Sequence, residues 1–227
     1  LRDKKEYYCY NWIELERRNL QADDKIIEVE DFGAGSAIIK SDKRVIKNIA
    51  TSSLKPRKYA QLLFRMANYY QSATILELGT SLGITTSYLA SANENVKVYT
   101  CEGSKNIAKI ARQTFKELKL KNIELIEGDF NQTLQPLLST LHTIDLAFVD
   151  GNHRKVPTLQ YFEQLLQHST SSTILVFDDI HWSEEMEVAW KTIQEHPAVT
   201  LTIDLFFIGI VCLNKDFKVK QHFIIAY

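Results

Sequence analysis

Residues 74–85 read TILELGTSLGIT and join a short apolar strand, through a glycine turn, to the start of a helix. The first five residues are mostly apolar or β-branched, and Gly79 and Gly83 stand four positions apart. Apolar residues at helical spacing follow over 84–92. This stretch therefore predicts one strand–turn–helix unit of a sheet whose strands alternate with helices.

The same alternation continues along the chain. Apolar runs separated by helical segments indicate a parallel sheet buried on both faces. Two apolar runs near the end, 199–205 and 207–213, are joined by almost nothing, which permits a hairpin but no parallel crossover. We predict an α/β, doubly wound (Rossmann-like), seven-stranded, mostly parallel sheet with an antiparallel last strand and helices on both faces. The expected strands are 74–78, 96–101, 123–126, 144–149, 173–177 and the two runs above, and the expected helices are 84–92, 104–120, 133–140, 156–167 and 184–195.

The segment before this alternation is predicted to be an N-terminal extension, residues 1–52, attached to a main domain, residues 53–227. Within 4–20, Tyr8, Trp12 and Leu15 recur at helical spacing among charges, which predicts an amphipathic helix. A short strand follows at 26–32. The sequence GAGS at 33–36 fits a hairpin turn better than a phosphate-binding loop, because no buried strand precedes it and no clear helix follows.

The charge, the cysteine content and the apolar runs of the chain each bear on which classes of function are expected. The 227 residues hold 27 basic and 28 acidic side chains, so a net charge of -1 gives no support for a nucleic-acid partner. Three cysteines without a CxxC pair fit a reduced interior. No stretch approaches about 18 apolar residues without a charge, so we expect no membrane span and a cytoplasmic location.

In a doubly wound sheet, ligands bind beyond the carboxyl ends of the strands, so the residues there are the candidates for function. Glu77 precedes a glycine loop that lacks GxGxxG, and its charge disfavours a diphosphate and suits a positively charged ligand. Glu102 ends the next strand, where a carboxylate can accept both hydroxyls of a ribose. Gly128, Asp129 and Phe130 end the third strand and fit either an adenine site or a simple turn.

Three carboxylates end the fourth and fifth strands: Asp150 in VDGNH, and Asp178 and Asp179 in FDDIHW. Like charges that gather without a counter-ion are unfavourable, and a hard divalent cation with oxygen ligands removes the conflict. Magnesium is the natural choice, with calcium or manganese as alternatives. The competing interpretation is that Asp178 caps a helix and Asp179 is solvated.

These motifs resemble, in order and spacing over about residues 53–213, those of class I S-adenosylmethionine-dependent methyltransferases. They resemble in particular the metal-dependent O-methyltransferase branch, with its catechol, caffeoyl-coenzyme A and sugar-modifying members. The resemblance implies that 53–227 is the catalytic domain, that S-adenosylmethionine is the cofactor and that Mg²⁺ or another divalent cation binds Asp150, Asp178 and Asp179. It implies a cofactor site made of Glu77, Gly79, Thr80, Ser81, Gly83, Thr85, Glu102, Ser104, Gly128, Asp129, Phe130 and Asp150.

His153 follows Asp150 by three positions, and the same D-x-x-H spacing in the sugar-modifying relatives implies a base that takes the acceptor's proton. The competing interpretation is that His153 orients Asp150 or packs the loop. His181 and Trp182 are candidates for the acceptor pocket, although an aromatic side chain there fits packing equally well.

The leading hypothesis is therefore metal-assisted O-methylation of a small-molecule hydroxyl, with His153 and Asp150 as catalytic residues. A non-catalytic S-adenosylmethionine-binding module would need the cofactor motifs but not the Asp and His set. A nucleotide-cofactor oxidoreductase lacks its glycine fingerprint here. The family's habit implies a homodimer, and residues 1–52 are expected to cover the cofactor or substrate or to contact the second subunit.

Overall fold

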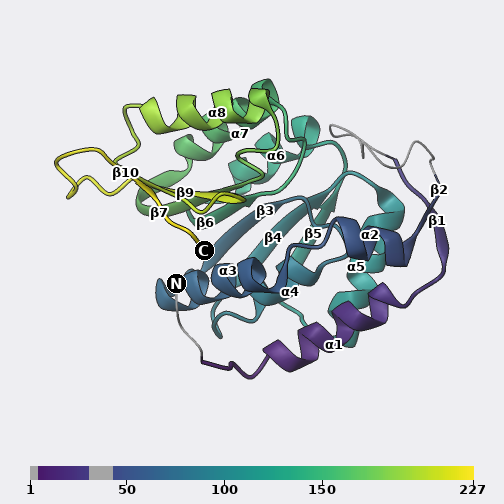
Figure 1. Ribbon diagram of the computed structural model, residues 1–227. Coiled ribbons are helices and arrows are strands. Elements are labelled where there is room, and N and C mark those ends of the chain that lie inside the picture. Colours follow the sequence, from purple (N-terminus) through teal and green to yellow (C-terminus); the bar gives the residue numbers. More distant parts are fainter. Residues whose placement is uncertain (1–4, 31–42) are drawn as a thin grey trace. The chain divides into compact units, whose positions relative to one another are not determined.

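The computed structural model of the protein describes residues 5–30 and 43–227 (Figure 1). Helices and strands alternate through most of the chain, as the sequence predicted. Their bounds, in chain order, are α1 (Tyr10–Gln21), β1 (Ile26–Glu28), β2 (Lys43–Val45), α2 (Ile46–Ser52), α3 (Arg57–Tyr69), β3 (Thr74–Leu78), α4 (Ile84–Ala90), β4 (Lys97–Glu102), α5 (Lys105–Glu117), β5 (Ile123–Glu127), α6 (Phe130–Thr140), β6 (Ile144–Val149), α7 (Lys155–Gln167), β7 (Ser169–Asp178), α8 (Glu184–Glu195), β8 (Leu201–Asp204), β9 (Ile208–Cys212) and β10 (Gln221–Ile224).

The main sheet has the strand order β10-β8-β9-β7-β6-β3-β4-β5. From β3, the chain adds β4 and β5 on one side of the sheet and β6, β7 and the later strands on the other. This is the doubly wound pattern that the sequence predicted. The expected antiparallel strand is β9, which pairs with both β7 and β8 in the opposite direction. One strand was not foreseen: β10 adds to β8 in parallel and raises the count from seven to eight.

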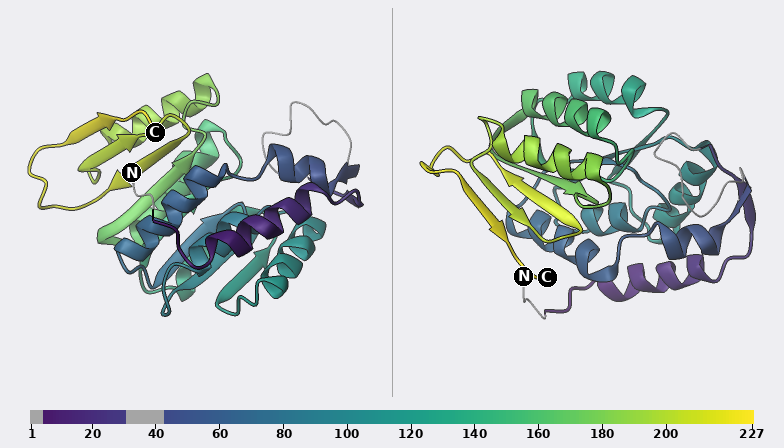
Figure 2. Two further views of the ribbon diagram at one scale, coloured as in Figure 1. Left: turned by 60° about the horizontal axis from the view of Figure 1, so that its bottom comes forward. Right: turned by 45° about the horizontal axis from the view of Figure 1, so that its top comes forward.

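The chain packs as two compact units. The first unit comprises residues 1–73 and 79–133 and contains β4 and β5, which pair in parallel. Helices α1, α3 and α5 all contact α4 in this unit, and the views in Figure 2 show α1 lying along its outer side. The second unit comprises 74–78 and 134–227, and in it β3, β6, β7, β9, β8 and β10 form one continuous set of paired strands.

Helix α1 buries a different face from the one predicted. Tyr8, Trp12 and Leu15 are exposed to 77%, 67% and 53%, so the predicted apolar face points to solvent. The buried face carries Tyr10, Ile13, Glu14, Arg17 and Leu20 instead. Its two charged members are compatible with burial because they pair with each other, and the hydroxyl of Tyr88 in α4 donates a further hydrogen bond to Glu14.

The buried Glu14 carboxylate in α1 accepts hydrogen bonds from two side chains. Glu14 Oε1 accepts from Arg17 Nε at 3.0 Å and from the hydroxyl of Tyr88 at 2.9 Å. Tyr88 is completely buried in α4. A buried carboxylate is stable only when such donors surround it, so this set specifies how α1 docks on α4.

In the second unit, α7 and α8 pack against each other, and α7 lies against β7 (Figure 1). Ser183 caps α8, since its hydroxyl accepts a hydrogen bond from the N–H of Met186 at 3.3 Å. Glu184, Glu185 and Glu187 occupy the first turn, where negative charge is favoured by the helix dipole. These signals explain why the predicted bounds of α8 agree with the observed ones.

Among the described residues, no helix is both long and apolar enough to cross a membrane. The short elements α2, β2 and β10 were not predicted. The strand expected at 26–32 is observed as β1, which pairs with β2 in antiparallel fashion. The GAGS segment, 33–36, lies outside the described residues, and the division at residue 52 stays a prediction.

Candidate functional site

The predicted site residues fall into two sets. The first set surrounds the glycine loop between β3 and α4. Gly79 and Gly83 have φ of 101° and 84°, values that favour glycine, and Ser81 between them also has a positive φ of 48°. The loop is tied to β4, because the N–H groups of Gly79 and Thr80 both donate to the carbonyl of Cys101, at 3.0 and 3.2 Å.

The carboxylate of Glu102 organises this first set. One of its oxygens accepts the N–H of Ser81 at 2.9 Å, and the other accepts the N–H of Ser104, also at 2.9 Å. Each carboxylate oxygen keeps capacity for a further hydrogen bond, so the predicted contact with ribose hydroxyls is compatible with this arrangement. The carbonyl of Glu102 also accepts from the N–H of Gly128, at 2.9 Å, which joins the ends of β4 and β5.

Two serine hydroxyls near Glu102 could form hydrogen bonds with a ligand. Ser81 Oγ and Ser104 Oγ are buried and form no hydrogen bond with any described residue. Thr80 differs, since its hydroxyl lies 2.6 Å from that of Thr100. A cofactor with hydroxyl, amino and carboxylate groups matches this combination of backbone turns and serine hydroxyls.

Asp129 has a structural task in addition to its predicted one. Its Oδ1 accepts the N–H of Asn131 at 2.9 Å, and its carbonyl accepts the N–H of Gln132 and of Thr133, so it begins α6. Gly128 has a φ of 133°, and a Cβ there would lie 3.0 Å from Thr133. These hydrogen bonds form the simple turn that the sequence left open.

The second set lies in the second unit, at the ends of β6 and β7. Asp150, His153 and Asp178 each place one ligand atom so that the three atoms lie within 4.8 Å of one another. His153 Nε2 is 3.6 Å from Asp150 Oδ1. Asp178 is 1% exposed, whereas the other two are half-buried, so the group is open on one side. Two carboxylates and an imidazole at this spacing form a donor set for a divalent cation.

Local backbone conformation places these side chains. His153 has a φ of 34°, its neighbour Asn152 has 68°, and Asp179 has 52°. The N–H of Asp179 donates to the carbonyl of Phe207 at 2.7 Å, which holds the turn after β7 against the β8–β9 connection. The carboxylate of Asp179 lies 4.0 Å from His153 Nδ1. Asp179, predicted as a third ligand, thus approaches the imidazole.

The candidate acceptor residues differ in their surroundings. His181 uses both ring nitrogens: Nε2 is 2.8 Å from Asp204 Oδ2, and Nδ1 is 3.3 Å from Glu187 Oε1. Its ring also stacks on Phe206, with centroids 5.5 Å apart. Trp182 is 63% exposed. His181 is therefore integrated into a polar network, while Trp182 is accessible to a ligand.

Sequence reasoning did not find the carboxylate that anchors this network. Asp204 is 5% exposed, and it accepts hydrogen bonds from the N–H of Phe206 at 2.8 Å and from the indole of Trp190 at 3.2 Å. It ends β8, so a search of all strand ends for acidic residues would have marked it. Three predicted residues remain. Glu77 and Thr85 are 0% and 6% exposed in β3 and α4, and Phe130 is the half-buried first residue of α6.

Residues 76–180 match the family model of a methyltransferase domain. Among curated proteins, a tRNA (guanine-N(7)-)-methyltransferase of Mycoplasma mobile is 36% identical over 77 residues, which are 34% of this chain. The chain spans only 38% of that relative's length.

Solved structures resemble the chain over nearly its whole length. The O-methyltransferase from Bacillus cereus, in complex with SAH, has a TM-score of 0.63 at 20% identity, and the match covers 92% of both chains. The O-methyltransferase TomG from Streptomyces achromogenes, in complex with SAM, has a TM-score of 0.65 at 18% identity and covers 92% of this chain and 91% of its own. These likenesses confirm the predicted fold class, and residues 76–180 are the part of the chain that is similar to a methyltransferase domain.

Proposed function

We propose that this methyltransferase domain transfers the methyl group of S-adenosylmethionine to a hydroxyl of a small molecule, assisted by a divalent cation. The observation that carries the proposal is the group of Asp150, His153 and Asp178, whose ligand atoms lie within 4.8 Å of one another. A domain that only bound the cofactor would not require this group.

The residues in and around the glycine loop supply most of the cofactor contacts in this proposal. The glycine turns at Gly79 and Gly83 and the hydroxyl of Ser81 would receive the methionine part, together with Glu77, whose charge suits the positive ligand. Glu102 would accept the ribose hydroxyls. Ser104, Gly128, Asp129 and Phe130 would bind the adenosine end, and Thr80 and Thr85 complete the predicted set.

The reaction breaks the bond between the sulfonium sulfur and the methyl carbon, and the sulfur keeps the electron pair. A lone pair of the acceptor oxygen forms the new bond to that carbon, and the hydroxyl proton leaves. A hydroxyl with a pKa of about 10 or above is mostly protonated at neutral pH, so the transfer gains from a group that takes this proton. We assign that role to the imidazole of His153.

The cation site combines the predicted ligands Asp150, Asp178 and Asp179. Mg²⁺ prefers oxygen ligands, and the nearby imidazole also suits manganese or a related cation. When bound, the cation would lower the pKa of the acceptor hydroxyl and orient it. The donor set fits such an ion, because two carboxylates meet at the ends of adjacent strands.

Calorimetric titration with S-adenosylmethionine, with and without Mg²⁺, tests the proposal. We expect cofactor binding to the wild type, and metal binding that Asp178→Asn weakens at least tenfold. Asp216→Asn is the matched control, since Asp216 is an exposed carboxylate in the same unit and should bind like the wild type. Absence of cofactor binding would remove the central claim, and cation binding that is equal in Asp178→Asn would withdraw the metal site.

His153 needs a separate test, because its ring belongs to the same group as the carboxylates. If it is the base, His153→Ala keeps metal and cofactor affinity and loses methyl transfer. If it is a ligand, the same variant loses metal affinity first. Unchanged turnover of an identified acceptor by His153→Ala would exclude both roles.

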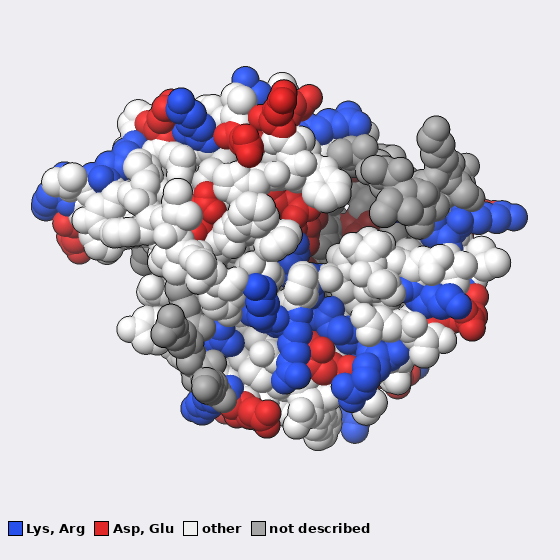
Figure 3. Space-filling model, viewed as in Figure 1, with Lys and Arg blue, Asp and Glu red and all other residues white. Residues whose placement is uncertain are grey.

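A tRNA base is a second candidate acceptor, favoured by the 36% identity to the tRNA-modifying relative over 77 residues. Basic side chains gather in the lower half of the face drawn in Figure 3, with acidic ones among them. Incubation with labelled S-adenosylmethionine and unmodified tRNA discriminates the two acceptors. Incorporation into tRNA would replace the small-molecule proposal, and we expect none.

Location and assembly complete the proposal. We propose that the protein acts in the cytoplasm, without a membrane partner, and that it forms a homodimer. Light scattering tests the assembly: a mass near 52 kDa, twice that of the 26.2 kDa chain, is expected, and a monomer would contradict it.

A further inference from the structure

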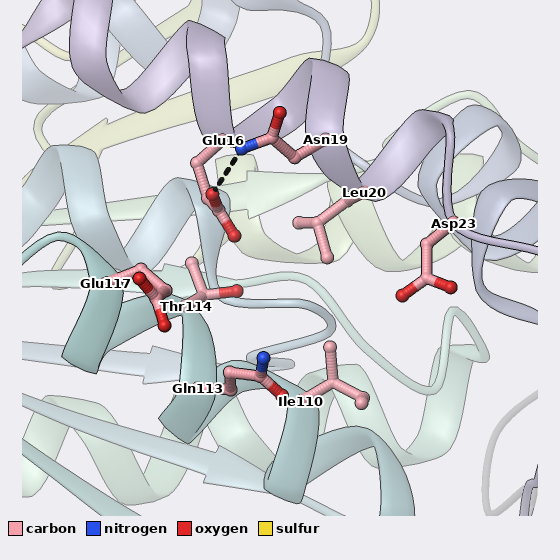
Figure 4. Close-up of a pocket in the computed structure, with 8 residues that line it drawn as sticks. All are labelled: Glu16, Asn19, Leu20, Asp23, Ile110, Gln113, Thr114 and Glu117. Carbon is pink, nitrogen blue, oxygen red and sulfur yellow. Dashed lines mark hydrogen bonds between the residues drawn. The ribbon is translucent and has the colours of Figure 1, made fainter. Parts of the chain in front are cut away.

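A pocket of about 260 Å³ lies between α1 and α5, within the first unit and apart from the residues discussed above (Figure 4). The C-terminal halves of both helices form it. Helix α1 and the residues after it contribute Glu16, Asn19, Leu20 and Asp23, and α5 contributes Ile110, Gln113, Thr114 and Glu117. Nothing in the proposed methyl transfer uses this pocket.

The pocket is negatively charged. Glu16, Asp23 and Glu117 line it, and none of the three forms an ion pair with another residue in the part of the chain that the structure describes. Figure 4 shows Glu16 and Glu117 on one side of Leu20 and Asp23 on the other. The two groups of negative charge are thus separated by an apolar side chain.

Helix ends increase this negative potential at both sides. Glu117 is the last residue of α5, and Asp23 follows the end of α1 by two residues. The carbonyl groups at a helix C-terminus carry partial negative charge, which favours a cation within the last turn. Each end of the pocket therefore combines a carboxylate with a helix C-terminus.

Thr114 supplies an independent sign of a ligand. Its side chain is 1% exposed, and Oγ1 makes no hydrogen bond within residues 5–30 and 43–227. In Figure 4 this hydroxyl points into the space between the two helices. A buried hydroxyl without a partner costs free energy, and an amino group that entered the pocket would satisfy it.

A single metal ion does not fit these carboxylates. Among the described residues, only Asp150, His153 and Asp178 bring three ligand atoms within 4.8 Å, so Glu16, Asp23 and Glu117 are spread too widely. An elongated molecule with a positive charge at each end fits the separation. Leu20 and Ile110, which line the middle, offer apolar contact to a hydrocarbon chain.

We propose that this pocket binds a linear aliphatic diamine, with one ammonium group at Glu16 and Glu117, the other at Asp23, and the methylene chain along Leu20 and Ile110. The Thr114 hydroxyl accepts a hydrogen bond from the ammonium group nearer to it. Because the pocket is small, short diamines of about four or five carbons are the expected ligands.

Calorimetric titration of the full chain with 1,4-diaminobutane at about 0.15 M salt tests this proposal. We expect one saturable site with a Kd of about 1 mM or tighter. The uncharged 1,4-butanediol should not bind. 1-Aminobutane should bind about two- to fivefold more weakly than the diamine, because one half-exposed ion pair is lost. Equal affinity for 1-aminobutane, or no binding of the diamine up to about 10 mM, would overturn the proposal.

Substitutions of the carboxylates that line the pocket test whether the diamine binds there. Asp23→Asn keeps the acceptor that receives the N–H of Lys25 at 2.8 Å, so it removes charge while preserving the local turn. We expect Asp23→Asn and Glu117→Gln each to weaken diamine binding three- to fivefold and to weaken it further together. Glu94→Gln, at an exposed position outside the pocket, is the charge-matched control. Unchanged binding by the double variant would place the diamine elsewhere, and cofactor titration of the same variants reports on the methyltransferase proposal independently.

Discussion

Substituting Gly83 by alanine tests whether the glycine loop has the conformation described here. Gly83 has a φ of 84°, and a Cβ there would lie 2.6 Å from Cε1 of Phe115 and 3.3 Å from Cβ of Ala111. Distances near 2.6 Å are far inside ordinary contact, so Phe115 or the loop must move. Two separate costs therefore accompany the added methyl group.

The expected loss of stability in Gly83→Ala is the sum of these two costs. A residue with a Cβ in the left-handed region costs roughly 1–2 kcal/mol, and overpacking a well-filled core costs about 1–3 kcal/mol. We expect Gly83→Ala to lower the free energy of unfolding by about 2–5 kcal/mol. Since the loop is also the proposed methionine site, affinity for S-adenosylmethionine should fall in the folded variant.

Urea unfolding of a double-mutant cycle separates the two contributions. Phe115→Leu removes the ring atoms that clash, so in this background Gly83→Ala should keep only the backbone cost of roughly 1–2 kcal/mol. Gly103→Ala is the control, because Gly103 is not among the residues with positive φ. A free energy of unfolding for Gly83→Ala within about 0.5 kcal/mol of the wild type, which is the usual additivity error, would contradict both costs. A cycle without coupling would contradict the clash with Phe115.

Three further predictions concern buried polar groups and a thiol. Glu14→Ala leaves the Arg17 guanidinium buried without its carboxylate, and urea unfolding should show a loss of about 3–5 kcal/mol; a loss below about 1 kcal/mol would contradict the buried pair. Asp204→Asn replaces an acceptor of three hydrogen bonds and should cost about 1.5–3 kcal/mol, with the imidazole resonances of His181 shifted in an NMR spectrum; an unchanged spectrum would refute the network. Burial raises the pKa of the Cys9 thiol to about 11 from 9.0, so the folded state holds its proton more tightly and the stability contributed by Cys9 is complete below pH 9 and lost as the pH rises through about 11. Alkylation mapped by mass spectrometry at pH 8 should accordingly be far slower at Cys9 in the folded than in the unfolded protein, and equal rates would disprove the burial.

Strand and helix types were predictable because local signals and tertiary packing agree. The runs 74–78, 144–149 and 184–195 match β3, β6 and α8 in full. Each is bounded by residues that end it for a local reason, such as the Gly79 turn or the Ser183 cap. Short elements such as β10, all of whose residues are exposed, carry no apolar periodicity and were missed.

Helix α1 shows where periodicity misleads. Tyr8, Trp12 and Leu15 have the spacing of an apolar face, yet they are exposed, and a face with two charged residues is buried. Periodicity measures hydrophobicity alone, whereas burial of Glu14 depends on donors from Arg17 and a distant tyrosine. A partner from another helix cannot be recognised in the local pattern.

The sequence indicates which carboxylates lie at these strand ends, but it does not indicate how their side chains are arranged. Strand ends identify Asp150, Asp178 and Asp179, because parallel strands bring their carboxyl ends to one edge. The direction of each side chain depends on single backbone angles, such as the φ of 34° at His153 and 52° at Asp179. These angles bring the imidazole into the group with Asp150 and Asp178 and set the carboxylate of Asp179 beside its other nitrogen.

This arrangement connects the two roles open to His153. Its Nε2 faces Asp150, and its Nδ1 faces Asp179. A nitrogen that bound a cation would have no lone pair left to take a proton, so the same nitrogen cannot serve both roles. Replacing Asp179 by asparagine keeps the size of the side chain and removes the charge beside Nδ1. If Asp179 orients the imidazole as a base, Asp179→Asn lowers turnover and leaves cation affinity nearly unchanged, whereas a ligand role for Asp179 requires that cation affinity fall as it does in Asp178→Asn.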